Sequence, residues 1–351
     1  MTDAGAGLSF AQILAEIEQP EGIGPATVRR VFDSILAGAW SPEKIAGLLI
    51  ALRLKGESAG TIRSAAEAMR SAMSRVPHRF SAVLDTCGTG GDGHNTVNIS
   101  TGAAIIASAC GVVVAKHGNR AASSKCGTAD VLLELGLPID LKPEASSRVL
   151  AAAEIAFLMA PVHHPAMRFA GPVRRELGVR TIFNCLGPLA NPAGATHQLI
   201  GAYEDRIRPL MAQALAELGS VRAWVVRGVD GLDEISPSGP TRITELASGM
   251  LREFEVTPED FGIPRIPLSA IAGGDATENA AAIRSVLRGE PHPAAPAFLL
   301  NAAAALVVAK DLGPKQAAEL ARAAIQSGAA LRKLELWQTE AAAAAAAANP
   351  A

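Results

Sequence analysis

A glycine-rich segment in the first third of the chain has the composition of a phosphate-binding loop. Residues 88–101 read GTGGDGHNTVNIST and follow an apolar run at residues 82–86. Glycines let backbone N–H groups face an anion, and the apolar residues after Thr101 can begin a helix whose positive end faces the same way. The spacing fits neither GxGxxG nor a Walker-type GK[ST] motif. An ordinary turn between a strand and a helix remains the alternative.

A second segment, residues 116–124, reads KHGNRAASS and concentrates anion-binding groups. Lys116 offers a point charge to a phosphate, Arg120 offers a planar fork, and the two serines offer hydroxyl donors. A solvated loop before a helix cap at Thr128 is the alternative. Because both segments follow predicted strands, a shared phosphate site is favoured over two unrelated loops.

A third segment is acidic and also follows a predicted strand. Residues 230–234 read DGLDE. Adjacent carboxylates at a strand end suit Mg²⁺, which prefers oxygen ligands and bridges to substrate phosphates. Asp92 and Ser100 can supply further oxygens. An acidic turn is the alternative, because Asp and Gly are common turn residues.

A fourth segment, residues 171–192, is rich in proline, glycine and arginine and contains GPVRRELGVRTIFN followed by GPLANP. An arginine here can bind a carboxylate through two hydrogen bonds if it faces a cleft. Taken alone, Arg174 and Arg175 are more typical of surface charges.

The composition limits the classes of function. The chain has 351 residues, of which 49% are apolar and 4% aromatic, so about two domains built with alanine-rich helices are expected. Its 32 basic and 34 acidic residues nearly cancel, which argues against nucleic-acid and membrane partners. The four cysteines form no CxxC pair, and neither a leader nor a run of about 18 apolar residues is present, so we expect a cytoplasmic protein.

The pattern of apolar residues predicts an α/β fold with two domains. Residues 9–73 are helical, with starts at Ser9, Pro25 and Pro42. After Pro77, short β-branched runs alternate with helices, which predicts a mostly parallel central sheet flanked by helices. The predicted strands are 82–86, 112–115, 155–159, 198–201 and 223–226, and the predicted helices lie near 101–110, 128–135, 143–153, 207–218, 296–310 and 316–327.

The predicted domains are a small N-terminal helical domain at residues 1–76, joined by part of 163–192, and a large α/β domain at residues 77–340. Residues 341–351 are expected to form a frayed, dispensable alanine-rich helix. Ligands of parallel α/β sheets gather at the carboxyl ends of the strands, where the glycine, KHGNRAASS and acidic segments all lie. A return of residues 163–192 to the helical domain would create a cleft there.

Together, the four segments resemble the anthranilate phosphoribosyltransferase family, in order and in spacing. The resemblance extends from about Ser9 to the helices near Ser327. It implies transfer of the phosphoribosyl group of phosphoribosyl pyrophosphate to the amine of anthranilate, with release of pyrophosphate. It also implies a small helical domain and a large α/β domain, shared with pyrimidine nucleoside phosphorylases, and a homodimer formed through the helical domains.

The resemblance also implies roles for individual residues. Ser100, Asp233 and Glu234 would bind two Mg²⁺ ions. Anthranilate would be held by Gly88, Asn119 and Arg174, with His117 and His164 lining its path. Thr128 stands where the family often has serine, and the hydroxyl is retained. Phosphoribosyl pyrophosphate would be held by Gly88, Gly91, Asp92, Thr96, Asn98, Ile99, Ser100, Thr101, Lys116, His117, Gly118, Asn119, Arg120, Ala121, Ala122, Ser123, Ser124 and Thr128.

We expect no dedicated general base, because the aromatic amine of anthranilate is already unprotonated at neutral pH. Two other functions compete with this one. A pyrimidine nucleoside phosphorylase of the same fold would bind inorganic phosphate and a nucleoside, and a catalytically silent relative would bind nucleic acid. The DGLDE and KHGNRAASS segments favour the pyrophosphate donor, and the near-neutral charge argues against nucleic acid.

Overall fold

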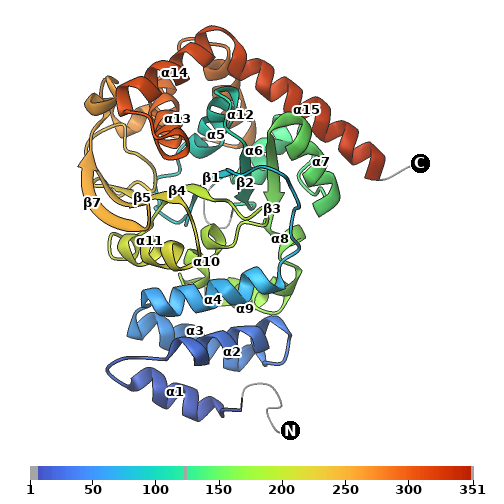
Figure 1. The fold of residues 1–351 in the computed structure, drawn as a ribbon, viewed down its shortest axis with the longest axis vertical. Coiled ribbons are helices and arrows are strands. Elements are labelled where there is room, and N and C mark those ends of the chain that lie inside the picture. Colours follow the sequence, from blue (N-terminus) through green and yellow to red (C-terminus); the bar gives the residue numbers. More distant parts are fainter. Residues whose placement is uncertain (1–6, 122–124, 349–351) are drawn as a thin grey trace.

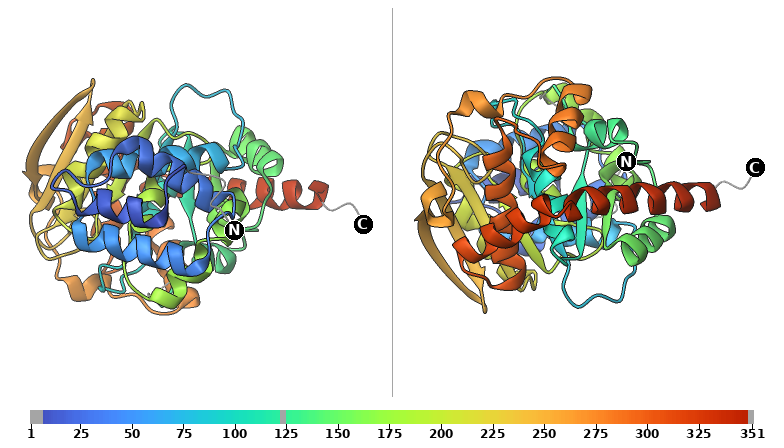
Figure 2. Two further views of the ribbon diagram at one scale, coloured as in Figure 1. Left: turned by 90° about the horizontal axis from the view of Figure 1, so that it is seen from below. Right: turned by 90° about the horizontal axis from the view of Figure 1, so that it is seen from above.

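The computed structural model describes residues 7–121 and 125–348, which form a seven-stranded sheet with helices on both faces (Figures 1 and 2). The strand order is β3-β2-β1-β4-β5-β6-β7. The first five strands run parallel, and β6 and β7 are antiparallel additions at one edge. Their bounds are β1 Leu84–Gly88, β2 Val114–Gly118, β3 Ile155–Met159, β4 His197–Gly201, β5 Arg222–Gly228, β6 Thr241–Ala247 and β7 Met250–Val256.

Four helices precede the sheet and lie at one end of the molecule (Figure 1). They are α1 Phe10–Glu18, α2 Pro25–Leu36, α3 Pro42–Lys55 and α4 Ala59–Ala72. The three predicted starts are confirmed: Ser9 caps α1, and Pro25 and Pro42 are the first residues of α2 and α3. The start of α4 was not predicted, although the Ser58 hydroxyl accepts a hydrogen bond from the Thr61 N–H and so caps the helix.

The remaining helices cover the two faces of the sheet. One face carries α5 Ile99–Ala109, α6 Thr128–Glu134, α7 Pro143–Ala153, α12 Ala276–Leu287, α13 Ala295–Lys310, α14 Pro314–Gln326 and α15 Ala329–Ala348. The other face carries α10 Phe183–Leu189 and α11 Ile207–Glu217. The short helices α8 Ala160–His163, η1 Pro165–Arg168 and α9 Gly171–Leu177 follow β3, and η2 Pro258–Phe261 and η3 Leu268–Ile271 follow β7.

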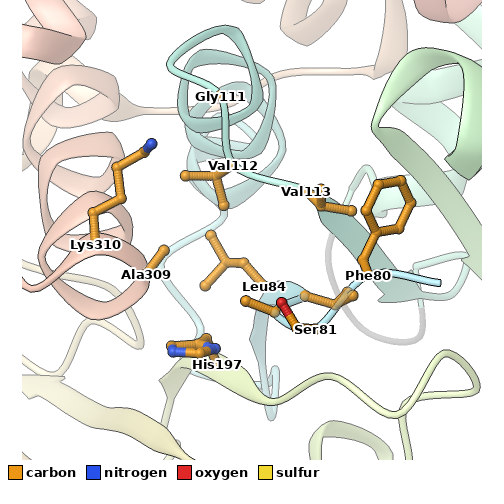
Figure 3. A pocket seen from close by; sticks show the side chains of 11 residues that line it. Phe80, Ser81, Leu84, Gly111, Val112, Val113, His197, Ala309 and Lys310 are labelled. Carbon is orange, nitrogen blue, oxygen red and sulfur yellow. The ribbon is translucent and has the colours of Figure 1, made fainter. Parts of the chain in front are cut away.

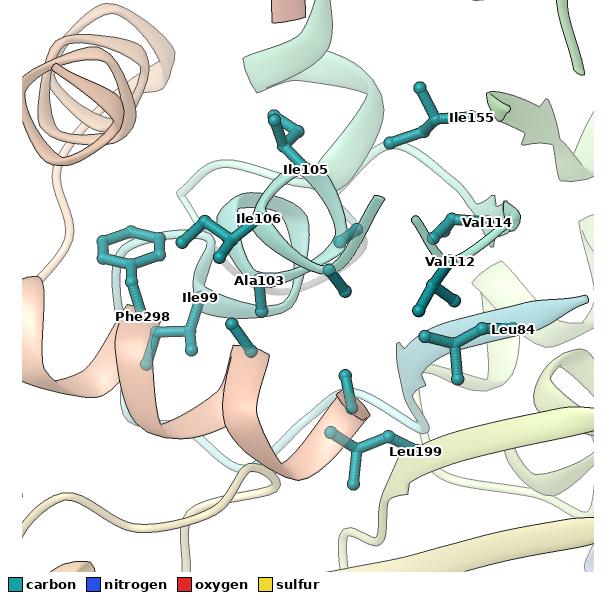
Figure 4. Packing of buried hydrophobic residues seen from close by; sticks show 14 of the residues in the cluster. Leu84, Ile99, Ala103, Ile105, Ile106, Val112, Val114, Ile155, Leu199 and Phe298 are labelled. Carbon is teal, nitrogen blue, oxygen red and sulfur yellow. The ribbon is translucent and has the colours of Figure 1, made fainter. Parts of the chain in front are cut away.

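Each face of the sheet has its own hydrophobic core. In the first, Leu84 and Leu199 of the sheet pack under α5 and α13 (Figure 4). The two helices approach closely at Gly102, where a Cβ would lie 2.4 Å from the Phe298 ring. The second core runs from α1–α4 through α9–α11 to the opposite face of the sheet, with the Phe32 and Phe183 rings 5.5 Å apart. Residues 163–192 thus pack against the N-terminal helices, while the predicted domain boundaries stay a prediction.

Three strands end later than predicted, at Gly88 in β1, Gly118 in β2 and Gly228 in β5, and one hairpin was missed. β1 continues to Gly88 because this residue pairs with Gly201, and β2 continues to Gly118 because it pairs with Met159. Lys116 therefore lies in β2, and its assignment to a loop was wrong. The β6–β7 hairpin turns at residues 248 and 249, which have φ angles of 51° and 75°, the backbone of a type I′ turn.

The described part of the alanine-rich tail, residues 341–348, is a regular helix. α15 continues to Ala348 (Figure 2). Ala341 and Ala344 are buried. Arg148 of α7 donates a hydrogen bond to the carbonyl of Ala344 at 3.4 Å. For residues 341–348 the expectation of a frayed tail was wrong, because alanine both favours the helix and is small enough to pack closely against α7. Residues 349–351 lie outside the described residues.

No single helix of residues 7–121 and 125–348 is long and apolar enough to cross a membrane. Taken together, α13 and α14 are long and apolar enough to meet that criterion, but the chain bends by 116° between them. Most of α13 is buried in the first core.

Candidate active site

The acidic segment packs directly on the ends of two neighbouring strands. Gly88 and Gly201 are paired at the carboxyl ends of β1 and β4. A Cβ at Gly88 would lie 2.6 Å from Oδ2 of Asp233, and a Cβ at Gly201 would lie 1.6 Å from the Asp233 backbone oxygen. Both positions therefore require glycine. Sequence reasoning missed Gly201, although a glycine at the end of a predicted strand was the available signal.

Two carboxylates from this segment face the glycine-rich segment. Asp233 accepts a hydrogen bond from the Gly90 N–H at 3.1 Å, and Glu234 accepts one from the Ser100 N–H at 3.2 Å. Burial and the neighbouring Asp92 carboxylate raise the pKa of Asp233. Burial and the Asp233 carboxylate likewise raise the pKa of Glu234. A cation at this point would relieve the desolvation and the mutual repulsion.

Asp230, the first acid of the same segment, has a different task. Its carboxylate accepts hydrogen bonds from the Ser238 hydroxyl at 2.6 Å, from the Ser236 hydroxyl and from the Leu232 N–H at 3.1 Å. These bonds close the turn that presents Asp233 and Glu234.

The chemistry of these donors fits Mg²⁺. Across the described ranges, no three His, Cys, Asp or Glu side chains form a ready-made metal site. Mg²⁺ usually needs only one or two carboxylates, because waters and substrate phosphates complete its coordination. Asp233 and Glu234 supply that pair.

Lys116 brings a buried cation to the same place. Its side chain is 1% exposed, and Nζ donates to the carbonyl of Thr86 and to Oγ of Ser100, the latter at 3.2 Å. Burial lowers the pKa of Lys116, and the nearby Asp85 carboxylate opposes this effect. Ser100 thus lies between the Lys116 ammonium and the Glu234 carboxylate.

Asp85 anchors the segment around this cation. Its carboxylate accepts hydrogen bonds from the His117 N–H at 3.1 Å and from Nδ2 of Asn191 at 2.8 Å. Burial raises the pKa of Asp85 to about 6, although the Lys116 charge opposes the shift. Asn191 belongs to the GPLANP segment, so this network ties that segment to β1 and β2.

Two neutral histidines lie beside this network. The His117 and His164 ring centroids are 5.0 Å apart. Burial lowers the pKa of His117 to about 3 and that of His164 to about 4. His117 Nδ1 lies 3.0 Å from the carbonyl of Gly187, which assigns the proton to Nδ1. Nε2 of each ring is buried and has no hydrogen-bond partner in the described part of the chain.

Arg174 is a half-buried cation without a counter-charge among the described residues. Its guanidinium lies 5.1 Å from the centroid of the Phe183 ring, and burial lowers its pKa. No described carboxylate lies within ion-pair distance of it, whereas its neighbour Arg175 is exposed. Phe183 begins α10, the helix whose Gly187 contacts His117. No hydrogen bond or ion pair in the described ranges joins Arg174 to Asn119 or Gly88, the other predicted anthranilate residues.

The glycine-rich segment ends in the first turn of α5. Asn98 is its N-cap residue, and its side-chain oxygen accepts a 2.9 Å hydrogen bond from Asn279 of α12. The Thr101 hydroxyl is buried and has no partner among the residues described. The Ile99 side chain is in the core and its N–H donates to the Val97 carbonyl. Thr96 bridges to Ala272, and the Gly91 carbonyl accepts a hydrogen bond from Arg180.

The segment after β2 is anchored at both of its described ends. A Cβ at Gly118 would lie 2.8 Å from the Phe157 ring. Asn119 is exposed, Arg120 forms a 3.0 Å ion pair with Asp130, and Thr128 is the first residue of α6. The predicted residues Ala122, Ser123 and Ser124 lie outside the described residues, and Ala121 directly precedes them.

A cavity of about 250 Å³ lies elsewhere, at the amino ends of the strands (Figure 3). Its lining includes Phe80, Leu84, His197 and Lys310. None of the predicted site residues lines it, so it is separate from the cluster described above.

Comparison with known proteins assigns the family. A model described as the glycosyl transferase family α/β domain matches residues 81–331, and the helical bundle domain of that family matches residues 12–73. Anthranilate phosphoribosyltransferase from Desulfatibacillum aliphaticivorans is 47% identical over 329 residues, covering 93% of this chain and 97% of that protein. The chain belongs to the anthranilate phosphoribosyltransferase family.

Solved structures of anthranilate phosphoribosyltransferases share the fold. The enzyme from Thermus thermophilus has a TM-score of 0.88 at 41% identity, over 95% of this chain and 98% of that one. The enzyme from Saccharomyces cerevisiae, in complex with PRPP and Mg, has a TM-score of 0.87 at 28% identity and the same coverage. The predicted fold class and family are confirmed.

Proposed function

We propose that this protein transfers the 5-phosphoribosyl group of phosphoribosyl pyrophosphate to the amine of anthranilate. The carbon–nitrogen bond forms at C1 of the ribose, pyrophosphate leaves, and the amine loses a proton. One observation carries the proposal: Ser100 joins the buried ammonium of Lys116 to the carboxylate of Glu234. A cation suited to bind phosphate and a pair of acids suited to bind Mg²⁺ thus meet at one point at the carboxyl edge of the sheet.

The leaving pyrophosphate is the group that this cluster stabilises. Asp233 and Glu234, with Ser100, would hold Mg²⁺, and we infer two ions. Bound Mg²⁺ neutralises negative charge on the pyrophosphate. The chain's own residues position the donor, with Lys116 and the first turn of α5 providing donors to its oxygens. The other residues predicted for phosphoribosyl pyrophosphate keep that role in the proposal.

Anthranilate would be held by its carboxylate and its amine separately. Arg174 has no counter-charge among the described residues, so an incoming carboxylate would satisfy it through two hydrogen bonds. Nε2 of His117 carries a lone pair, because the proton of this ring lies on Nδ1. Nε2 can therefore accept a hydrogen bond from an N–H of the amine. His164 lines the same path. Asn119 and Gly88 complete the predicted set.

No strong base is required in this mechanism. The amine of anthranilate attacks in its neutral form, so catalysis rests on positioning and on stabilising the leaving group. His117 and His164 stay neutral at pH 7, which suits hydrogen-bond acceptors better than proton donors.

We also propose the predicted homodimer, formed through the helical domains, and a cytoplasmic location. The family resemblance supports the dimer, and the placement of α1–α3 at one outer end of the molecule is compatible with it (Figure 1). The proposed domains remain residues 1–76, with part of 163–192, and residues 77–340.

The test compares two reactions with one purified enzyme. Anthranilate fluorescence should fall when phosphoribosyl pyrophosphate and Mg²⁺ are present, and phosphate with a pyrimidine nucleoside should give no free base. Phosphorolysis without loss of anthranilate would instead identify a nucleoside phosphorylase. Nucleic-acid binding without either reaction would identify the silent relative.

A further inference from the structure

The carboxylate of Asp130 binds both sides of the segment that follows β2. Oδ2 accepts hydrogen bonds from the Ala121 N–H at 3.1 Å and from the Gly127 N–H at 3.0 Å. Oδ1 accepts one from Nη1 of Arg120 at 3.0 Å. One side chain therefore connects residues that enter the segment with a residue that leaves it.

The two sides touch at this point. A Cβ at Gly127 would lie 2.2 Å from the backbone nitrogen of Ala121, and the Ala129 N–H donates to the Asn119 carbonyl at 3.1 Å. Burial raises the pKa of Asp130, but the Ala121 and Gly127 N–H groups and Arg120 outweigh burial and bring it below its usual value. The Ala121 and Gly127 N–H groups and Arg120 thus bind the ionised form of the Asp130 carboxylate.

Helix capping alone does not explain these contacts. Asp130 is the third residue of α6, and a capping residue there needs only the N–H of Gly127, the N-cap residue. The bonds to Ala121 and Arg120 reach across the segment to residues on its entering side. They add nothing to the helix, but they hold Asn119, Arg120 and Ala121 in place.

We propose that Asp130 is a positioning residue that latches the Asn119–Ala121 stretch against α6 and so sets the affinity for phosphoribosyl pyrophosphate. The affinity part of this proposal rests on the proposed function, because Asn119, Arg120 and Ala121 are substrate residues only there. The latch itself does not depend on the proposed function, because Asp130 makes these hydrogen bonds in the protein without ligand.

The ligand-free arm of the test is hydrogen–deuterium exchange on the full chain. In Asp130→Asn the side chain keeps one acceptor oxygen and loses its charge, so peptides covering residues 119–121 and 127 should exchange about tenfold faster than in wild type. Asp260→Asn is the matched control, because Asp260 is the third residue of η2 and accepts the Thr257 N–H at 2.7 Å without touching a predicted site residue. That control should leave these peptides unchanged.

A second variant should separate residue 127 from the Ala121 backbone without altering the Asp130 carboxylate. Gly127→Ala places a methyl group where the Ala121 backbone now lies, so it should raise exchange in the same peptides. Unchanged exchange in both Asp130→Asn and Gly127→Ala would overturn the latch. If Asp130→Asn fails to fold, Gly127→Ala alone decides.

The kinetic arm separates positioning from simple stability. Asp130→Asn should raise KM for phosphoribosyl pyrophosphate about tenfold and KM for anthranilate by less, because Asn119 alone of the latched residues is assigned to both substrates, with kcat within about threefold of wild type. Asp260→Asn should change neither KM value nor kcat, whatever it does to the melting temperature. Faster exchange with unchanged KM would overturn the affinity part. If wild type fails to react with anthranilate and phosphoribosyl pyrophosphate, the proposed function and the affinity part fall together, and exchange still decides the latch.

Discussion

Substitution Gly201→Ala tests how tightly the sheet positions the acidic pair. The new Cβ would lie 1.6 Å from the Asp233 backbone oxygen, and an ordinary contact requires about 3.4 Å, so the segment must move by roughly 2 Å. A misplacement of about 1 Å at a catalytic group can lower the rate about 100-fold. We therefore expect kcat/KM to fall by at least about 100-fold, with a loss of about 1–3 kcal/mol of stability from overpacking.

The assay is loss of anthranilate fluorescence with phosphoribosyl pyrophosphate and Mg²⁺, with circular dichroism to confirm that the variant is folded. Gly239→Ala is the matched control, because no atom lies within 4 Å of its would-be Cβ and the residue lies just beyond the same acidic segment. The control should keep kcat/KM within about twofold of wild type. A folded Gly201→Ala protein with wild-type activity would refute the role given to this close approach.

Three further predictions follow from the site. Arg174→Ala should raise KM for anthranilate about 10- to 100-fold with little change in KM for phosphoribosyl pyrophosphate, and Arg174→Lys should recover only part of the loss, as steady-state kinetics will show. Asp233→Ala combined with Glu234→Ala should abolish Mg²⁺-dependent turnover, and activity at the wild-type rate across a Mg²⁺ titration would contradict the metal assignment. The pKa of His164 is about 4 in the folded protein against an ordinary value of 6.5, so the unfolded chain binds more protons between these pH values and stability falls as pH is lowered through that window. Urea unfolding at pH 7.5 and pH 5 should show wild type losing about 2 kcal/mol more than His164→Gln, and equal losses would contradict the shift.

The sheet and its flanking helices could be predicted because local signals agree with the fold. Strand 155–159 and helix 143–153 match the structure residue for residue; Pro143 marks the start of the helix, and Pro161 follows soon after the strand. The ends of β1 and β2 could not be placed, because pairing partners far along the chain extend them to Gly88 and Gly118. The hairpin at 241–256 carried one local signal, the Ser248-Gly249 pair at its turn.

The candidate site shows the same division between local and distant information. The segments that carry the phosphate, metal and arginine residues can be recognised in the sequence from their residue types and their order. Asp130 carried a local signal, because Gly127 and Asp130 have the spacing of a capping box. Asn279 carried none, because its contact with Asn98 joins residues 181 positions apart. The task of Asp230, which differs from that of Asp233 and Glu234, needed the hydrogen bonds of the folded turn.

The most direct test of the proposed function is detection of its two products. Wild-type enzyme with anthranilate, phosphoribosyl pyrophosphate and Mg²⁺ should form N-(5-phosphoribosyl)anthranilate and pyrophosphate in equal amounts, measured by mass spectrometry and a pyrophosphate assay. Removal of Mg²⁺ with a chelator should stop both. Absence of the phosphoribosylated product under these conditions would contradict the account.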